Sequence, residues 1–381
     1  MAEFKKYKQF WGKQVRDIPV YHLLLIVLWI VIQVILFLKF GIVTDGEAEK
    51  YLSESDLLIT EQKLSSNQFI LYGSYIIYVT FCKLLGFSVF GIYILQTLFS
   101  GISLIVFYHI CKGQLKNTLS ATLAVCLLIV CIPYQSWNNH LYTESFFLSL
   151  QLTFLFFYFK YGIKNLGTWL ILLLFLFSRP TAILSITAVL IHAAYSHCLM
   201  QKITTRLILL TSISILCIFL LINSFLSIGG SYDFKKPFVE GNVICYIPSE
   251  ISIQPDTSGI TNPNTLQGIG KLIIKNPGFF AQLFLKRSSS YFGLTRDHFS
   301  KRHNLLLIGF FYPLYLMAAI ALVFVLRTNK PLMIFILSFI SLFWGSVLLT
   351  CDDWLNRFFM PIVPILLLTS ASLFAKREIS H

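Results

Sequence analysis

Long apolar runs separated by short charged segments make up most of the chain. The first run, 18–40, follows a basic stretch and is long enough to span a bilayer, which takes about 20 apolar residues. Because a cleaved signal peptide has a shorter apolar core, we interpret this run as an uncleaved first helix. Further spanning helices are predicted at 89–111, 115–132, 144–161, 166–178, 180–196, 205–228, 303–327, 331–350 and 358–375.

One more apolar run, 69–87, can be interpreted in two ways. It is long enough to cross, but it contains Gly73, Ser74, Thr80 and Lys83 and joins the next helix almost without a loop. The distribution of basic residues separates the two interpretations, because loops on the cytoplasmic side of a membrane carry an excess of Lys and Arg.

If 69–87 does not cross, the basic residues gather as this rule requires. One side of the membrane then carries 15 basic and three acidic residues, and the other carries 15 basic and 14 acidic residues. The six segments on the basic side are the N-terminus, 112–116, 160–164, 202–206, 327–330 and 376–377. If 69–87 did cross, five of these segments would move outside. We therefore predict that 69–87 is interfacial or re-entrant and that both termini are cytoplasmic.

The same rule requires a turn at Ser178-Arg179-Pro180. The segment 166–201 has basic residues near both ends, so it is expected to cross and return as two short helices. Pro180 is expected to start the second helix, where its missing N–H costs nothing. Arg179 is then expected on the outer side, in the break between the two helices.

The outer side receives three segments in this topology: 41–88, 133–143 and 229–302. The last contains five prolines, and its stretch 277–292 has the pattern of a helix with Phe279 and Phe280 on one side. We expect either an interfacial amphipathic helix there or a small packed subdomain. The chain accordingly divides into an N-terminal membrane module, a long outer loop and C-terminal helices: 1–228, 229–302 and 303–381.

Composition supports the same class. Of the 381 residues, 56% are hydrophobic and 12% are charged, whereas a soluble domain has about 25% charged residues. The pI near 9.3 would suit a nucleic-acid-binding protein, but the basic residues lie between the apolar runs, where membrane topology requires them. We therefore predict an all-α polytopic membrane protein with about ten transmembrane helices and no nucleic-acid partner.

Cysteine and histidine residues give no sign of a metal site. Neither the eight cysteines nor His140, His192 and His197 have metal-ligand spacing, and most cysteines lie inside apolar runs, where small packing residues are expected. Cys245 and Cys351 are different because both are expected on the outer side. Whether these two form a disulfide stays open.

Charged residues gather at the predicted outer boundary of the membrane. Ionisable groups at membrane depth cost about 2.5–3.5 kcal/mol each on insertion scales, so they are candidates for function. Carboxylates can act as general bases or bind cations, and arginines suit phosphate. The candidates are Asp45, Glu47 and Tyr51 after the first helix, Tyr142 and Glu144 before the fourth, then Arg179, Asp352, Asp353 and Arg357.

Each candidate also has an ordinary structural explanation. Glu144 could stabilise the N-terminus of its helix, and Arg179 and Arg357 could reach lipid headgroups. Asp352 and Asp353 could bind a divalent cation, but we assign no metal site and no cofactor. The other acidic residues of the first outer loop are expected to be solvated: Glu49, Glu54, Asp56 and Glu61.

At these residues the chain resembles the GT-C superfamily of polyprenyl-phosphate-dependent glycosyltransferases. The nearest resemblance is to glycosyltransferase family 39, which includes protein O-mannosyltransferases and lipid A aminoarabinose transferases. An Asp-Glu pattern followed by Tyr opens the first outer loop in that family, similar to Asp45, Glu47 and Tyr51. An interfacial segment ending in Phe-Gly or Leu-Gly follows there, similar to Leu85-Gly86. The resemblance covers most of the chain in layout, through short motifs.

Other features of that family have counterparts later in the chain. A second acidic residue precedes the fourth helix, similar to Glu144, and a basic residue beside Gly or Pro lies between helices five and six, similar to Arg179-Pro180. Arg-Tyr with spaced prolines near the end is similar to Arg357-Phe358 and the prolines after it.

The chain departs from the family pattern in two respects. Gly46 separates Asp45 from Glu47 where many members have adjacent acids, which puts the role of Glu47 in doubt. The chain also has no large C-terminal soluble domain of the kind found in some relatives, so acceptor recognition is expected from its own loops.

The resemblance implies an enzyme that transfers a sugar, with inversion, from a polyprenyl-phosphate donor to a glycan, lipid or protein acceptor. The transfer would occur on the periplasmic or lumenal face, most simply of a bacterial inner membrane. The implied catalytic residues are Asp45, as the general base, together with Glu47 and Glu144. The implied phosphate ligands are Arg179 and Arg357. The implied substrate contacts are Tyr51, Tyr142, Asp352 and Asp353. Segments 69–87 and 277–292 would form the groove for the polyprenyl chain.

Two other functions stay open. A transporter or flippase of lipid-linked sugars would have charges at mid-bilayer and repeated halves, whereas the interiors of the predicted helices are nearly uncharged and no repeat is evident. A polysaccharide polymerase or ligase would use arginines of the long outer loop, where Arg287, Arg296 and Arg302 are candidates.

Overall fold

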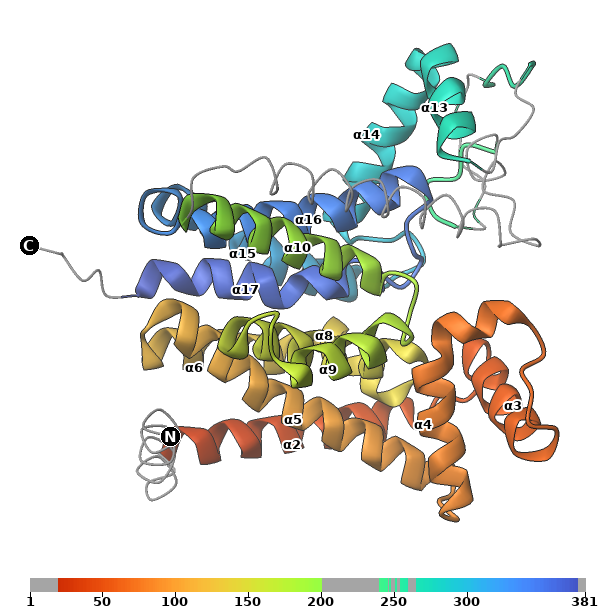
Figure 1. Ribbon diagram of the computed structural model, residues 1–381, viewed down its shortest axis with the longest axis vertical. Helices are drawn as coiled ribbons and strands as arrows, with labels where there is room; N and C mark the ends of the chain where they lie inside the picture. The colour runs from red at the N-terminus through yellow and green to blue at the C-terminus, as the bar shows by residue number, and fades with distance from the viewer. Residues whose placement is uncertain are drawn as a thin grey trace, which may run out of the picture.

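The computed structural model describes residues 20–200, 240–245, 247, 251, 254–259 and 265–375 and shows a bundle of helices (Figure 1). Over these residues only two isolated bridges join extended segments, and every named element is helical. The prediction of an all-helical fold is therefore confirmed. The predicted helix at 205–228 lies outside the described residues, as do both termini.

The helices that run along the bundle lie close to the predicted apolar runs. They are α2 (Val20–Phe40), α5 (Val89–Leu115), α6 (Thr118–Val130), α8 (Thr143–Tyr161), α9 (Leu166–Leu176), α10 (Ala182–Met200), α15 (Lys301–Thr328), α16 (Lys330–Leu349) and α17 (Val363–Ala371). Side-chain caps fix several starts: Ser88, Asn117 and Ser300 each accept a hydrogen bond from a backbone N–H in the first turn of the helix that follows.

Shorter elements connect these helices and cover one end of the bundle. They are α3 (Glu47–Thr60), η1 (Asn67–Tyr72), α4 (Gly73–Leu84), α7 (Ile132–Gln135), η2 (Ser136–Asn139), α13 (Leu266–Lys275), α14 (Pro277–Gly293), η3 (Met360–Ile362) and η4 (Ser372–Phe374). In Figure 1 the α3 and α4 region and the α13 and α14 pair lie at the same end of the bundle.

Four helices of the described chain are long and apolar enough to cross a membrane: α2, α5, α15 and α16. A fifth candidate is α6 together with the segment through Asn139, although these two parts meet at a 67° bend. The described chain therefore has four or five candidate spans, which is consistent with a helical membrane protein, and ten spans are not confirmed. Helix α9 shows one reason, because its 11 residues reach only about 16 Å against a hydrocarbon core of about 30 Å.

Helices α8 and α17 lie in the middle of the bundle. Helix α8 packs against α5 and α9, and α17 packs against α6 and α15, so that all nine residues of α17 are buried. Neighbouring helices shield α8 from lipid, which allows it to carry the buried polar residues Glu144, Ser145, Ser149 and Gln151. A helix in direct contact with lipid could not carry so many polar groups at this cost.

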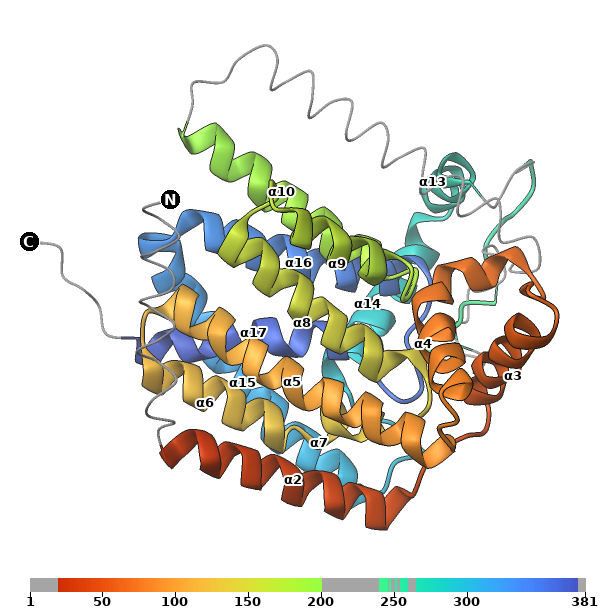
Figure 2. The same ribbon diagram turned by 60° about the horizontal axis from the view of Figure 1, so that its bottom comes forward.

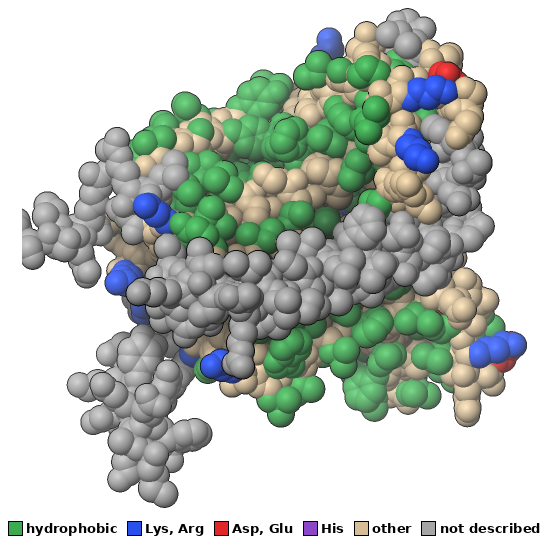
Figure 3. All heavy atoms as spheres, turned by 45° about the horizontal axis from the view of Figure 1, so that its top comes forward, with side chains coloured by type: hydrophobic (Ala, Val, Ile, Leu, Met, Phe, Trp, Pro, Cys, Tyr) green, Lys and Arg blue, Asp and Glu red, His purple; other side chains and the backbone are tan. Residues whose placement is uncertain are grey.

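The lipid-facing helices show the opposite pattern. Helix α2 exposes apolar side chains along most of its length, among them Leu24, Val27, Val34 and Leu38. On the face drawn in Figure 3, hydrophobic side chains occupy the middle and charged side chains lie toward the two ends. A surface of this kind is unfavourable in water and suits the hydrocarbon of a bilayer.

The two ends of the bundle differ in charge. The loops α5–α6, α8–α9 and α15–α16 lie at one end and carry Lys112, Lys116, Lys160, Lys164 and Lys330 with no described acidic residue. Every acidic residue in the described part of the chain belongs to segments at the opposite end. The predicted separation of acidic and basic loops is therefore present in the fold.

The ambiguous run 69–87 does not run along the bundle. It forms η1 and then α4, and α4 lies across the end of the bundle in both ribbon views (Figure 2). With 12 residues, α4 is only about 18 Å long and is not a candidate span. One side exposes Ile77, Phe81 and Leu84 while Tyr75 is buried, which agrees with an interfacial helix rather than a spanning one.

Helix α14 belongs to a small packed subdomain, the second of the two alternatives predicted for 277–292. Its residues Phe279, Phe280 and Leu283 are buried in one cluster with Ile269 and Leu272 of α13. Because this apolar side is covered by protein, α14 does not present it to lipid.

A buried network of amide side chains fastens the α6–α8 connection to the bundle. Gln33 of α2 donates a hydrogen bond to Gln135 (2.9 Å), and the Asn138 amide donates to the side-chain oxygen of Gln33 (3.1 Å). Ser145 at the start of α8 donates to the Asn138 carbonyl oxygen (2.5 Å). Gln96 of α5 donates to the backbone oxygens of Asn138 and His140. The network therefore joins α2, α5 and α8 directly beneath the outer loops.

Replacing Asn138 by Leu is expected to lower the free energy of unfolding by about 2–3 kcal/mol, because the Gln33 oxygen and the Ser145 hydroxyl lose their partner in a buried site. Unfolding by heat or denaturant in detergent measures this. Thr122→Ala is the control, since the Thr122 hydroxyl is exposed and bonds only to its own helix. Equal stability of the two variants would contradict a structural role for the network.

Candidate functional site

Two outer segments that are far apart in sequence meet at the start of α3 and α8. The Val43 N–H donates to the Asn139 oxygen (2.8 Å), and the Leu141 N–H donates to the Val43 oxygen (3.1 Å). The Asn139 side chain also donates to the oxygen of Gly41, which follows α2 (2.8 Å). These bonds bring the residues after α2 beside those before α8, so the predicted acidic residues of both segments become neighbours.

Gly46 makes the turn that separates Asp45 from Glu47. Its φ of +62° lies in the left-handed region, and a Cβ on this residue would lie 2.8 Å from the Tyr142 hydroxyl oxygen. After this turn Glu47 begins α3, whereas Asp45 stays outside the helix and exposed to solvent. The glycine between the two acids thus has a structural reason, since it sends them into different environments.

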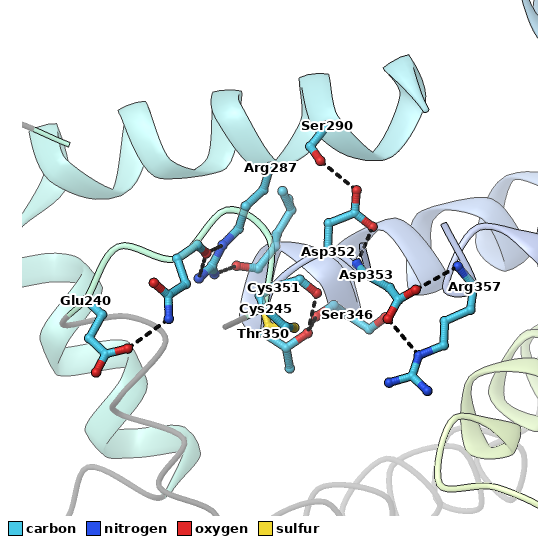
Figure 4. Close-up of a disulfide and its surroundings, with 12 residues drawn as sticks. Glu240, Cys245, Arg287, Ser290, Ser346, Thr350, Cys351, Asp352, Asp353 and Arg357 are labelled. Carbon is cyan, nitrogen blue, oxygen red and sulfur yellow. Dashed lines mark hydrogen bonds and ion pairs between the residues drawn. A yellow bond between two sulfur atoms is a disulfide. The ribbon is translucent and has the colours of Figure 1, made fainter. Parts of the chain in front are cut away.

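Five charged residues form the centre of the site, and we call them the ion-pair cluster: Glu47, Glu144, Arg179, Asp353 and Arg357. Glu144, only 1% exposed, places one carboxylate oxygen 2.5 Å from Arg179 Nη1 and 3.3 Å from Arg357 Nη1. Arg357 Nη1 also lies 2.8 Å from Glu47 Oε2, and its Nε lies 2.8 Å from Asp353 Oδ2. Figure 4 shows the Asp353–Arg357 pair.

Four separate segments contribute to this cluster. Glu47 and Glu144 occupy the first turns of α3 and α8, where helix dipoles favour carboxylates. Asp353 and Arg357 lie between α16 and η3. Arg179 lies in the turn between α9 and α10, as predicted, although α10 begins at Ala182 rather than at Pro180.

The cluster carries more negative than positive charge. Three carboxylates surround two guanidinium groups, and Arg357 is shared among all three carboxylates. Burial lowers the pKa of Arg357, but the carboxylates of Glu144, Asp353 and Glu47 outweigh this and hold the pKa above its ordinary value. Arg357 is therefore a permanent cation.

The second carboxylate oxygen of Glu144 is unsatisfied. Oε2 is buried and has no hydrogen-bond partner in the described part of the chain. Buried polar atoms without a partner are uncommon and call for an explanation, such as a role in binding. An ionised carboxylate oxygen can only accept, so a bound molecule would have to donate a hydroxyl or amide hydrogen to it.

Two tyrosines border the cluster. The rings of Tyr51 and Tyr72 lie 5.5 Å apart between centroids, and both hydroxyls are near enough to Arg179, Glu47 and Glu144 to feel their charges. Burial raises the pKa of both tyrosines, so both hydroxyls stay protonated and can donate. Tyr51 is a predicted candidate; Tyr72 is not, because a tyrosine near the start of the apolar run 69–87 gives no signal in the sequence.

A small pocket opens beside the two arginines. It encloses only about 10 Å³, room for about one water molecule. Its lining combines the two guanidinium groups and two hydroxyl side chains with apolar rings: Arg179, Arg357, Thr181, Ser346, Phe343, Phe358 and Pro361. The pocket combines positive charge with apolar side chains, of which Phe343 belongs to α16, one of the candidate spans.

Asp45 lies at the edge of the site rather than within the ion-pair cluster. It is exposed, and its charge acts on His140 and Tyr142. Burial lowers the pKa of His140, so this imidazole is neutral at neutral pH, and its Nδ1 lies 3.1 Å from the Ser136 oxygen. The contact identifies Nδ1 as the protonated nitrogen, because a backbone carbonyl can only accept.

Asp352, predicted together with Asp353, has a different role. Its carboxylate lies 2.5 Å from Arg296 and accepts a hydrogen bond from Ser290 (2.7 Å), away from the ion-pair cluster. Consecutive side chains of an extended segment point to opposite sides, which explains why only Asp353 reaches Arg357. Arg296 was not among the predicted substrate contacts, and the structure gives it a structural partner.

One acidic residue of the first outer loop differs from expectation. Glu54 is not solvated: it is buried, and its carboxylate accepts hydrogen bonds from the backbone N–H and the hydroxyl of Ser65. It therefore holds the connection between α3 and η1. Glu49, Asp56 and Glu61 are exposed, as predicted.

The chain was compared with protein-family models, curated proteins and solved structures, and none of the three comparisons gave a match. Its function must therefore be argued from the geometry and chemistry of the site. Among the residues that the structure describes, no three His, Cys, Asp or Glu side chains come together in a way that could hold a metal ion. Asp352 and Asp353, the candidates for a cation, are each paired with an arginine.

Replacing Glu144 by Gln is expected to lower the free energy of unfolding by about 3 kcal/mol, because Arg179 is left buried beside a neutral group. Denaturant unfolding in detergent measures the change. If Glu144 and Arg179 stabilise the fold as a pair, the double variant Glu144→Gln/Arg179→Gln should lose less stability than the two single changes added together. Glu49→Gln, on the exposed side of α3, is the matched control and should shift stability by less than about 0.5 kcal/mol. Strict additivity would argue against the pair.

Proposed function

We propose that the chain is a membrane glycosyltransferase that moves a sugar from a polyprenyl-phosphate donor to an acceptor hydroxyl. The observation that carries this proposal is the ion-pair cluster with its pocket. Arg179, which is buried, and Arg357, which is partly buried, line a small pocket together with apolar side chains, and one of these, Phe343, belongs to the candidate span α16. A lipid-linked sugar phosphate has the complementary chemistry, an anion joined to an apolar chain.

Binding of the donor requires the pocket to change. The space that it encloses is only about 10 Å³, room for about one water molecule, so a sugar phosphate cannot enter unless the lining side chains move. The cluster is also already negative, so an added phosphate must replace a carboxylate. Glu47 is the best candidate to leave, because its side chain is 30% exposed whereas those of Glu144 and Asp353 are almost fully buried. Its departure would free Arg357 Nη1 for the phosphate.

The chemical step follows from these positions. Asp45 removes the proton from the acceptor hydroxyl while the acceptor oxygen attacks the anomeric carbon. The bond between that carbon and the phosphate oxygen breaks, with inversion, through an oxocarbenium-like state. Arg179 and Arg357 stabilise the negative charge on the departing polyprenyl phosphate. Glu144 holds both guanidinium groups in place, and its free oxygen accepts a hydrogen bond from a sugar or acceptor hydroxyl.

Two independent features support an outer location for this end of the bundle. The basic loops lie at the other end, as in cytoplasmic loops. Cys245 and Cys351 form a disulfide at the end with the cluster, and disulfides persist in the periplasm, the lumen of the secretory pathway and outside the cell. The acceptor is then a glycan, lipid or protein on the outer face.

The two alternative functions receive less support. A ligase that relies on loop arginines needs their donors for substrate. Arg287 and Arg296 are buried and bond to backbone oxygens and to Asp352, and only Arg302 of the three candidates is exposed. A transporter needs charges near mid-bilayer, whereas the ion-pair cluster lies at one end of the bundle, where its helices begin or end.

Replacing Asp45 by Asn in the purified protein is expected to lower kcat for transfer by roughly 10²–10⁴-fold, the range for loss of a general base. The variant should unfold at the same temperature as the wild type, because Asp45 is exposed. The assay measures release of polyprenyl phosphate from a panel of polyprenyl-phosphate sugars. Glu49→Gln, a neighbouring exposed carboxylate, should keep full activity. Full activity of the Asp45 variant would refute its role as general base. If the wild-type protein used none of the donors, the proposed glycosyltransferase activity would be refuted.

Replacing Arg357 by Lys is expected to raise KM for the donor about tenfold, because lysine keeps the charge but cannot contact a phosphate with two parallel N–H groups. Steady-state kinetics with varied donor concentration measures it. Arg302→Lys, at an exposed position in the first turn of α15, is the matched control. An unchanged donor KM would show that Arg357 does not bind the phosphate.

A further inference from the structure

A disulfide fastens part of the long outer loop to the segment that carries Asp353. Cys245 and Cys351 are bonded, with Cα atoms 5.2 Å apart, and lie 106 positions apart in sequence (Figure 4). A short parallel bridge accompanies the bond: the Cys245 N–H donates to the Asp352 oxygen (2.8 Å), and the Asp352 N–H donates to the Val243 oxygen (2.8 Å). The residues before Cys245 therefore run beside the residues after Cys351.

Two buried arginines, one in α14 and one shortly after it, contact these parts of the chain: Arg287 contacts the residues before Cys245 and the end of α16, and Arg296 contacts the residues after Cys351. Arg287 is fully buried and donates to the Asn242 oxygen from Nε (2.9 Å) and Nη2 (2.7 Å), and from Nη1 to the Leu348 oxygen at the end of α16 (2.6 Å). Arg296 donates from Nη2 to the Asp352 carboxylate (2.5 Å) and to the Asp353 backbone oxygen (3.0 Å). We call these residues the outer-loop clamp: Cys245, Arg287, Arg296, Cys351 and Asp352.

The clamp ends directly at a member of the ion-pair cluster. Asp353 follows the clamp residue Asp352, and its Oδ1 accepts the backbone N–H groups of Leu355 (2.9 Å) and Arg357 (3.3 Å). Its Oδ2 lies 2.8 Å from Arg357 Nε. The position of the Arg357 guanidinium, which lines the pocket, thus depends on Asp353 and through it on the position of the clamped segment.

We infer that the Cys245–Cys351 disulfide positions a residue of the site. It fixes the alignment of the segment after Cys351 against the segment before Cys245, and this alignment places Asp353 where it orients Arg357. The bridge beside it has two backbone hydrogen bonds, and each contributes little alone. The covalent bond closes a long loop and removes most of the conformational freedom that would oppose this register. Its effect on sugar transfer rests on the proposed function, whereas its effect on the order of 351–357 is a property of the fold.

The test is hydrogen–deuterium exchange on the full-length protein in detergent, with the variants Cys245→Ser and Cys351→Ser and the double variant. We expect the amides of Leu355 and Arg357 to exchange about tenfold faster or more in each variant, while α5 and α8 keep wild-type protection. Because both residues act through one bond, the double variant should match the single ones. Cys126→Ser, in α6 and outside any disulfide, should match the wild type.

Activity supplies the second readout. The serine variants should show a donor KM raised about tenfold, as for Arg357→Lys, with a smaller change in kcat. If exchange became faster evenly over the bundle, with no local effect at 351–357, the disulfide would only stabilise the fold in general. That result would overturn the inference. If a serine variant fails to fold, the same exchange experiment on folded wild type before and after reduction replaces it, and unchanged exchange then overturns the inference. A wild type that uses no donor would sink the proposed function, while the exchange result would still decide on the clamp.

Discussion

The end of the bundle that carries the ion-pair cluster depends for its arrangement on one buried carboxylate, that of Glu144, whose charge must be neutralised inside the protein. Glu144 lies in the first turn of α8 and contacts Arg179 and Arg357, which come from two other connections between helices. Removing one member of such a pair leaves an uncompensated charge in a buried site, at a cost of about 3–5 kcal/mol. The loops that carry these residues are therefore held together by the same contact that defines the site.

Much of this was predictable from the sequence, because the cost of charge in lipid limits where charged residues can lie. The apolar runs predict the helices, and the loop charges predict which ends share a side. Together they bring Glu144, Arg179 and Arg357 to one end without any knowledge of packing. The number of spans is less predictable. Helix α9 is too short to span a bilayer alone. Helix α8 is apolar but covered by its neighbours, so an apolar composition does not show that a helix contacts lipid.

The pairing of the charges was not predictable, because it depends on backbone geometry at single residues. Asp352 and Asp353 are identical in sequence terms, yet the bridge to Ile244 directs Asp352 to Arg296 and leaves Asp353 to Arg357. The disulfide likewise follows from this bridge rather than from cysteine spacing. Tyr72 reaches the site only because η1 ends where α4 turns across the bundle, which no periodicity indicates.

The carboxylates of the site fall into two groups, those in ion pairs and one that is exposed to solvent. Glu47, Glu144 and Asp353 each form an ion pair with Arg357. Asp45 makes no ion pair with any residue that the structure describes, and it is exposed at the edge of the site. The turn at Gly46 is what keeps it apart from Arg357 while Glu47 is drawn in. Gly46 therefore leaves the carboxylate before it exposed to solvent, while the acidic residue after it becomes part of the ion-pair cluster.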